Sequence, residues 1–203
     1  YVLYFDEKSG NWFTYRIADG AKTNLTERIP VKFFDEGHDT PDLPPSLGSG
    51  GWTDGDKSVL LYDQFDIWEI HPDGTGARMI TGGEGRKQHL VFRYRPIDIE
   101  ARTVPTNKPL LLSATNEDTK ATGYFLVPFT AGYPEQMIML DKRIGPPIKA
   151  KNAEVIVYKK DDTAGAVMET TRGRAEIEKG YAMVFKDRDP ALKSRNVVED
   201  AKF

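Results

Sequence analysis

Residues 51–81, GWTDGDKSVLLYDQFDIWEIHPDGTGARMIT, decide the fold because they contain three short apolar runs separated by turns. The runs lie at 59–62, 67–70 and 77–81, and an Asp-Gly pair at 73–74 separates the last two. Runs of this length are typical of β-strands, and glycine tolerates the positive φ that a tight hairpin requires. We therefore expect an antiparallel sheet of short strands in this stretch.

The same order of features occurs at the start of the chain. Four segments correspond in sequence order. The run 2–6 (VLYFD) matches 59–63 (VLLYD), and the aromatic run 12–17 matches the strand that contains Trp68. Asp-Gly at 19–20 then matches 73–74, and Leu-Thr at 25–26 matches Ile-Thr at 80–81. In this alignment Trp12 and Trp68 occupy equivalent places, and we expect both in the core between sheets. An ordinary β-meander does not require such an order of distinct features, so the match indicates a repeated unit.

A third and a fourth unit follow with looser matches. The expected strands lie at 109–114, 123–127 and 136–139 for the third unit, and at 154–159 for the start of the fourth. Small antiparallel sheets cannot cover both of their faces alone, so they stack. We predict an all-β, propeller-like array of three to four antiparallel β-sheet repeats, part of a larger propeller. An ordinary meander or sandwich is the alternative.

The chain divides into two parts on this interpretation. Residues 1–162 hold the repeats, with an inserted loop at 30–51, and 163–203 form an irregular C-terminal segment or a connector to a further domain. Within the second part, 181–185 suits one more strand. Asp189 followed by Pro190 is typical of a helix start, because Asp caps the first turn and Pro fits the first helical position.

Composition excludes few functions. The chain has 203 residues, a formal net charge of −3 and no cysteine, which excludes disulfides and Cys-ligated zinc and does not indicate a nucleic-acid partner. No apolar run is long enough for a membrane helix, so we expect no membrane span. Neither the spacing of a calcium loop nor a His-Glu-x-x-His pair is present, and we expect no metal or cofactor.

The stretch GWTDGDK at 51–57, followed by LLYD and by DIW at 66–68, resembles the blade pattern of the propeller in prolyl oligopeptidase family serine peptidases. It is also similar to Tol-type periplasmic propeller repeats, where a Trp-Ser-Pro-Asp-Gly turn precedes a strand; Thr53-Asp54-Gly55 stands in that turn here. The resemblance is best over 1–98. In that peptidase family the propeller is non-catalytic, covers an α/β-hydrolase domain and limits access to peptides.

The resemblance therefore implies a substrate-gating domain whose hydrolase domain lies outside this chain, with a periplasmic or extracellular location and peptide substrates. No catalytic residue can be carried over, because no serine here has glycines at both positions two away, as a nucleophile elbow requires. One alternative is a stand-alone periplasmic propeller that binds a protein or cell-envelope partner. A propeller glycosidase would need two carboxylates that flank a sugar pocket, which the sequence does not indicate.

Two groups of side chains are candidate binding residues. The inserted loop contains Asp35, Glu36, His38 and Asp39 close together, which suits either a cation or substrate-amine site or a solvated acidic loop. Arg93 and Arg95 share one side of an expected strand, because side chains alternate along it. They suit either bidentate capture of a peptide carboxylate or pairing with nearby acids on an exposed sheet face.

Overall fold

The structure is a computed structural model that describes residues 1–98, 100–130, 132–141 and 144–149, together with the backbone of strands at 156–162, 165–170, 173–178 and 181–184. The described chain is almost entirely β. Its helical segments are a 3₁₀ turn at Asp54–Asp56 and the short helix α1 (Glu84–Gln88).

Four antiparallel sheets follow one another along the chain, and strands pair with their neighbours in sequence. Sheet I contains β1 (Val2–Asp6), β2 (Asn11–Tyr15) and β3 (Lys22–Asn24). Sheet II contains β4 (Ser49–Trp52), β5 (Val59–Tyr62), β6 (Ile67–Ile70) and β7 (Ala77–Met79). Sheet III contains β8 (Leu90–Tyr94), β9 (Leu110–Asn116), β10 (Thr122–Val127) and β11 (Glu135–Leu140). Sheet IV contains β12 (Ile148–Lys149), β13 (Ile156–Asp162), β14 (Gly165–Thr170), β15 (Gly173–Glu178) and β16 (Tyr181–Val184).

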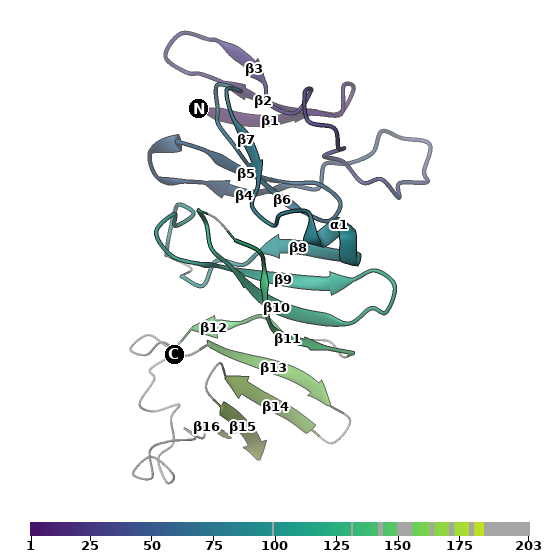
Figure 1. Ribbon diagram of the computed structural model, residues 1–203, viewed down its shortest axis with the longest axis vertical. Coiled ribbons are helices and arrows are strands. Elements are labelled where there is room, and N and C mark those ends of the chain that lie inside the picture. Colours follow the sequence, from purple (N-terminus) through teal and green to yellow (C-terminus); the bar gives the residue numbers. More distant parts are fainter. Residues whose placement is uncertain are drawn as a thin grey trace.

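The sheets lie one after another along the long axis of the molecule, with sheet I at one end (Figure 1). None of these four sheets closes on itself. The all-β, antiparallel part of the fold prediction is therefore confirmed.

Strand register shows that sheets I, II and III repeat one unit. The register between β1 and β2 matches that between β5 and β6 and that between β9 and β10. One set of corresponding pairs is Tyr4↔Phe13, Leu61↔Trp68 and Leu112↔Phe125. A second set, two residues away along the strands, is Val2↔Tyr15, Val59↔Ile70 and Leu110↔Val127. Side chains alternate between the two faces of a strand, so each of these sets lies on the same face of its sheet.

Two threonines have the same hydrogen bonds in sheets I and II. The Thr26 Oγ1 accepts from the Trp12 amide at 3.0 Å and donates to the Asn11 side chain at 2.9 Å. The Thr81 Oγ1 likewise accepts from the Ile67 amide at 3.1 Å and donates to Asp66 at 2.6 Å. These bonds confirm the predicted correspondence of Leu25-Thr26 with Ile80-Thr81.

Stacking of the sheets creates two main cores. Between sheets I and II the core consists of Trp12, Leu25, Phe33, Val59, Leu61 and Ile70, with Leu3, Phe5 and Trp68 packed against it. Between sheets II and III the core includes Leu60, Tyr62, Ile67, Ile80, Leu90, Phe92, Leu110, Leu112, Phe125 and Val127. Each inner sheet is therefore apolar on both faces, as a stack requires.

The predicted equivalence of Trp12 and Trp68 is wrong. Trp12 pairs with Phe5, whereas Trp68 pairs with Leu61, so Trp12 corresponds to Ile67 and Phe13 corresponds to Trp68. Trp12 thus stands one position earlier in its strand than Trp68 does, and because successive side chains alternate, the two tryptophans lie on opposite faces of their sheets. Both tryptophans still pack in the core between sheets I and II, as expected.

Three further differences from the sequence analysis concern elements. β4 begins inside the stretch assigned to the loop, and helix α1 was not expected. The backbone of 165–170, 173–178 and 181–184 forms β14, β15 and β16, where only a strand at 181–185 was expected. The helix start at Asp189 lies outside the described residues.

Candidate functional site

The inserted loop, the β5–β6 turn, helix α1 and the β9–β10 turn lie on the same side of the stack (Figure 1). We call this region the loop edge. The loop is anchored at its base, because Phe33 is buried and Phe34 forms an isolated bridge with Ser46. The Asp35 amide also donates to the Pro45 carbonyl at 3.0 Å, so only the residues between them project from the sheets.

Two buried aspartates organise the loop edge. The carboxylate of Asp63 accepts from the amides of Phe65 at 2.7 Å and Asp66 at 2.8 Å, and from the Trp68 indole at 2.8 Å. These bonds close the β5–β6 turn and fix the indole against it. Asp63 is therefore a structural residue whose bonds are satisfied within the fold.

Asp66 positions helix α1. Its carboxylate accepts from the Thr81 hydroxyl and from the amides of Gly85 and Arg86, both at 2.9 Å, and so satisfies amide donors of the first turn. Gly85 is required there, because a Cβ would lie 2.7 Å from the Asp66 carboxylate and 2.8 Å from the Leu90 carbonyl. Burial raises the pKa of Asp66, and the nearby charge of Asp63 acts in the same direction.

Arg86 connects helix α1 to the inserted loop. Its guanidinium lies 2.8 Å from the Glu36 carboxylate, 3.6 Å from Asp63 and 5.0 Å from the centre of the Phe65 ring. The Glu36 amide also donates to the Gln64 side chain at 3.4 Å, and Gln64 donates to Glu117 at 3.0 Å. Of the predicted loop residues, Glu36 is thus the one held by groups of the neighbouring sheets.

The other predicted loop residues form local contacts. The Nε2 of His38 lies 2.9 Å from both the Asp42 carboxylate and the Thr40 hydroxyl, while Asp35 accepts from the Gly37 amide at 2.9 Å. The Thr40 bond lowers the pKa of Asp42, and the His38 bond contributes in the same direction. Asp39 is exposed.

This arrangement does not form a catalytic triad. A triad places the hydroxyl on one ring nitrogen of histidine and the carboxylate on the other, whereas Thr40 and Asp42 share the Nε2 of His38. Among the described residues, no three His, Asp or Glu side chains are arranged to hold a metal ion. The loop acids form a largely exposed anionic surface.

Arg93 and Arg95 lie at the edge strand of sheet III, but neither has an ion pair within the part of the chain that the structure describes. The Arg93 guanidinium lies 4.8 Å from the centre of the Tyr62 ring and donates to the Phe92 carbonyl at 2.7 Å. Burial lowers the pKa of Arg93. Arg95 is exposed and donates to the Ser113 hydroxyl at 2.9 Å.

Arg93 therefore joins sheets II and III, and neither arginine has the carboxylate partner expected for a sheet face. Arg95 retains an exposed guanidinium that suits a small anionic group.

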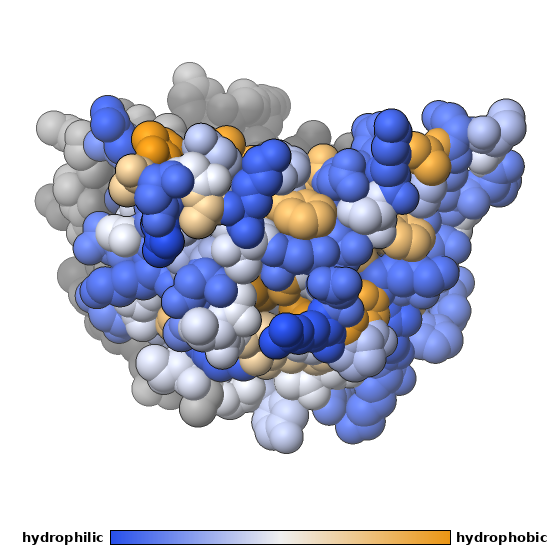
Figure 2. Space-filling model, turned by 90° about the horizontal axis from the view of Figure 1, so that it is seen from above, coloured by the Kyte–Doolittle hydropathy of each residue, from blue (hydrophilic) through white to orange (hydrophobic). Residues whose placement is uncertain are grey.

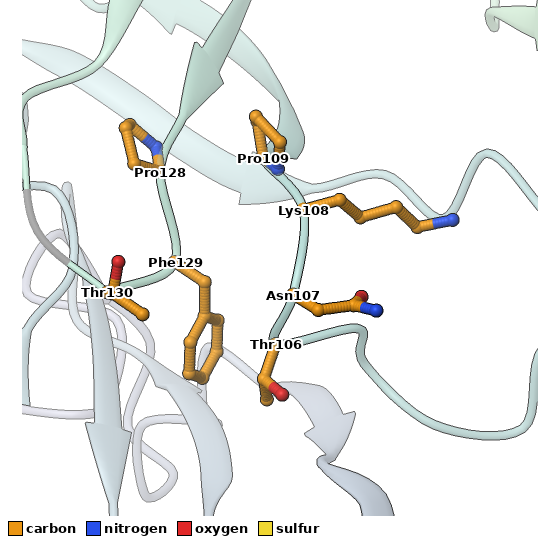
Figure 3. Close-up of a pocket in the computed structure, with 7 residues that line it drawn as sticks. All are labelled: Thr106, Asn107, Lys108, Pro109, Pro128, Phe129 and Thr130. Atoms are coloured by element: carbon orange, nitrogen blue, oxygen red, sulfur yellow. The ribbon is translucent and has the colours of Figure 1, made fainter.

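A small hollow of about 210 Å³ lies at the opposite side of sheet III and is lined by Thr106, Asn107, Lys108, Pro109, Pro128, Phe129 and Thr130. The Phe129 ring lies between the two lining segments, and the side chains of Asn107 and Lys108 point away from it (Figure 3). The Phe129 carbonyl already accepts a hydrogen bond from Arg78. The hollow thus lacks convergent polar groups, which a specific ligand site requires.

Sequence patterns gave part of this site. Glu36 and Arg93 were identified, but Arg86, Gln64 and Glu117 were missed. A five-residue helix leaves no detectable periodicity around Arg86, and Gln64 and Glu117 lie in two turns that are distant in sequence. The repeated Leu/Ile-Thr pairs contained a usable signal, since the partner of Thr81 is Asp66. No helix of the described residues is long and apolar enough to span a bilayer.

Comparison with protein-family models, with curated proteins and with solved structures found no match to this chain.

Proposed function

We propose that the chain is a propeller domain that controls substrate access in a prolyl oligopeptidase-like serine peptidase, whose catalysis resides in a separate hydrolase domain. The observation that supports this most is the repetition of one antiparallel unit in sheets I to III, with equivalent positions buried in each internal interface. Propeller blades are units of this kind, and the sequence of the second unit resembles blades of that peptidase family.

The inserted loop is the gating element in this proposal. Asp35 lies at its base, its projecting part carries Glu36 and Asp39, and the Arg86–Glu36 ion pair of 2.8 Å ties it to helix α1. Long loops positioned by a rigid sheet scaffold are frequent sites of recognition. Exposed carboxylates there attract the amino group or basic side chains of a peptide and thus favour its approach.

The proposal is tested on the product of the complete reading frame that contains this chain. We expect that product to react with a fluorophosphonate probe, whereas purified 1–203 does not. Residues 36–44 are then replaced by Asn-Gly, which preserves the bridge between Phe34 and Ser46, and the exposed substitution Lys22→Ser is the matched control.

The loop replacement is expected to raise kcat/KM for long peptides and to leave that for a short chromogenic substrate unchanged. A complete product that does not react with the probe contradicts the peptidase assignment. Unchanged selectivity for peptide length contradicts the gating role of the loop.

The second candidate function is a stand-alone periplasmic propeller that binds a protein or cell-envelope partner. The ordered attachment of the acidic loop through Glu36 and Arg86 favours it, since a preformed loop binds with a smaller entropy cost. A reading frame that encodes no hydrolase domain would support this candidate over the first.

A further inference from the structure

Sheet I has one covered face and one open face. Leu3, Phe5 and Trp12 lie on the covered face and pack in the core shared with sheet II. The alternate residues of the same strands point the other way. We call Val2, Tyr4, Phe13 and Tyr15 the open face of sheet I; within it Val2 is 48% exposed and Tyr15 37% exposed.

The residues equivalent to the open face are buried in both following sheets. In sheet II they are Val59, Leu61 and Ile70, at most 1% exposed, and the partly buried Trp68. In sheet III they are Leu110, Leu112, Phe125 and Val127, at most 5% exposed. In both sheets these residues contact the preceding sheet, so the corresponding positions of sheet I have the pattern of a sheet–sheet interface.

The composition of the open face agrees with this pattern. The rings of Tyr4 and Phe13 are stacked with centroids 5.5 Å apart, and Val2 and Tyr15 are paired beside them. Seen from this end, the molecule has apolar side chains both near its centre and toward its sides, with hydrophilic ones between them (Figure 2). Aromatic residues are enriched in protein interfaces relative to the rest of the surface.

We infer that the open face of sheet I is a docking surface for another antiparallel sheet of this same repeat, which covers it as sheet I covers sheet II. The inference rests on the strand register and burial of sheets I to III and is independent of the peptidase assignment. The partner sheet presents an aliphatic and aromatic face like that of Leu3, Phe5 and Trp12.

Two further features of sheet I match this partner. β5 and β9 each pair with a strand on both sides, through β4 and β8, whereas β1 pairs only with β2. Within the described residues the outer edge of β1 is therefore open, and an incoming repeat could place a strand there in the way that β4 adjoins β5. The second feature is a hydrogen bond between neighbouring units: the Thr14 hydroxyl of sheet I donates to the Pro72 carbonyl, which follows β6 of sheet II, at 2.5 Å. Ile17 is the residue of sheet I that corresponds to Pro72, and it is 69% exposed. The corresponding bond from an incoming repeat would therefore end at Ile17.

A second copy of the whole chain is a poorer occupant. Both described interfaces bring together two different faces of the repeat. Between sheets I and II, the face that carries Leu3 meets the face that carries Val59. Between sheets II and III, the face that carries Leu60 meets the face that carries Leu110. A symmetric pair of chains would instead place two open faces against each other.

The test adds one repeat to the intact chain. Ser58 and Tyr1 hold equivalent places before β5 and β1, so a second copy of residues 1–57 is fused in front of Tyr1. Ser9→Thr in the added copy gives its tryptic peptide a distinct mass. Hydroxyl-radical footprinting then measures the oxidation of Phe13 and Tyr15 in the original copy, and a thermal melt measures stability.

The expected result is a several-fold loss of oxidation at Phe13 and Tyr15, with an unfolding midpoint several degrees above that of the single chain. Phe13→Asp in the original copy should abolish the gain in midpoint but cost little in the single chain. Unchanged oxidation in the tandem protein would overturn the inference. So would a dimer of the single chain, seen by sedimentation velocity and dissociated by Phe13→Asp, because the occupant would then be a second copy.

Discussion

Replacement of Thr26 and Thr81 by valine, one at a time, tests whether sheets I and II are the same unit. Both side chains are almost fully buried, at 3% and 0% exposed, and valine conserves their shape while removing the hydroxyl. Thr81→Val leaves the Ile67 amide without its 3.1 Å acceptor and Asp66 without its 2.6 Å donor.

The magnitudes follow from those bonds. A buried amide left unpaired costs about 1–3 kcal/mol, and loss of a hydrogen bond to a carboxylate costs about 1.5–3 kcal/mol. We therefore expect Thr81→Val to lower the free energy of unfolding by about 3–5 kcal/mol. Thr26→Val, whose second partner is the neutral Asn11 side chain, should lower it by about 2–3 kcal/mol.

The assay is urea unfolding followed by tryptophan fluorescence, with the midpoint and slope fitted for each variant. The exposed Thr115→Val in β9 is the matched control and should change stability by no more than about 0.5 kcal/mol. Thr→Ser at 26 and 81 should retain most of the stability, since the hydroxyl remains. If only one of the two valine variants is destabilised, the equivalence of the two units is refuted.

Three other predictions concern single residues of sheet II. Trp68→Ala should cost about 3–5 kcal/mol in urea unfolding, because the indole packs in the core and donates to Asp63; a loss within about 0.5 kcal/mol would place it outside the core. Gly74→Val should destabilise the protein in a thermal melt and Gly37→Val much less, since Gly74 has φ +73° and its added Cβ would lie 3.0 Å from Thr23, whereas Gly37 has no positive φ. Burial raises the folded-state pKa of Asp66, so the folded state binds the proton more readily and the wild type should gain stability over Asp66→Asn as pH falls through that raised pKa; a difference that is constant with pH, or that moves in the opposite direction, would contradict this.

The sequence predicts where most strands lie better than it predicts which face each side chain occupies or where a strand begins. Alternation and Asp-Gly turns located β5, β6 and β10 because these signals are local. The equivalence of Trp12 with Trp68 was mispredicted, because an offset of one residue within a strand reverses the face but leaves the order of features unchanged. β4 was included in the loop because its glycines lack strand propensity.

The candidate site was harder to predict, because its contacts join distant segments. Glu36 and Arg86 meet only through the loop and helix α1, and the buried Asp66 acts through amides that no side-chain pattern records. The loop acids and Arg93 were identified as chemical types, but their partners depend on which sheets adjoin. The stacking of the aromatic ring of Tyr62 with Arg93 is an example.

The central claim is that one unit is stacked repeatedly with the same faces in contact, and aromatic NOEs in solution test it most directly. We predict cross-peaks between the rings of Tyr4 and Phe13, 5.5 Å apart, and between Phe33 and Trp68, 6.1 Å apart. We predict none between Phe13 and Trp68, because these equivalent residues lie on the same face of successive sheets, with sheet I between them. A Phe13–Trp68 cross-peak, together with loss of the Phe33–Trp68 contact, would contradict the stacked repeat.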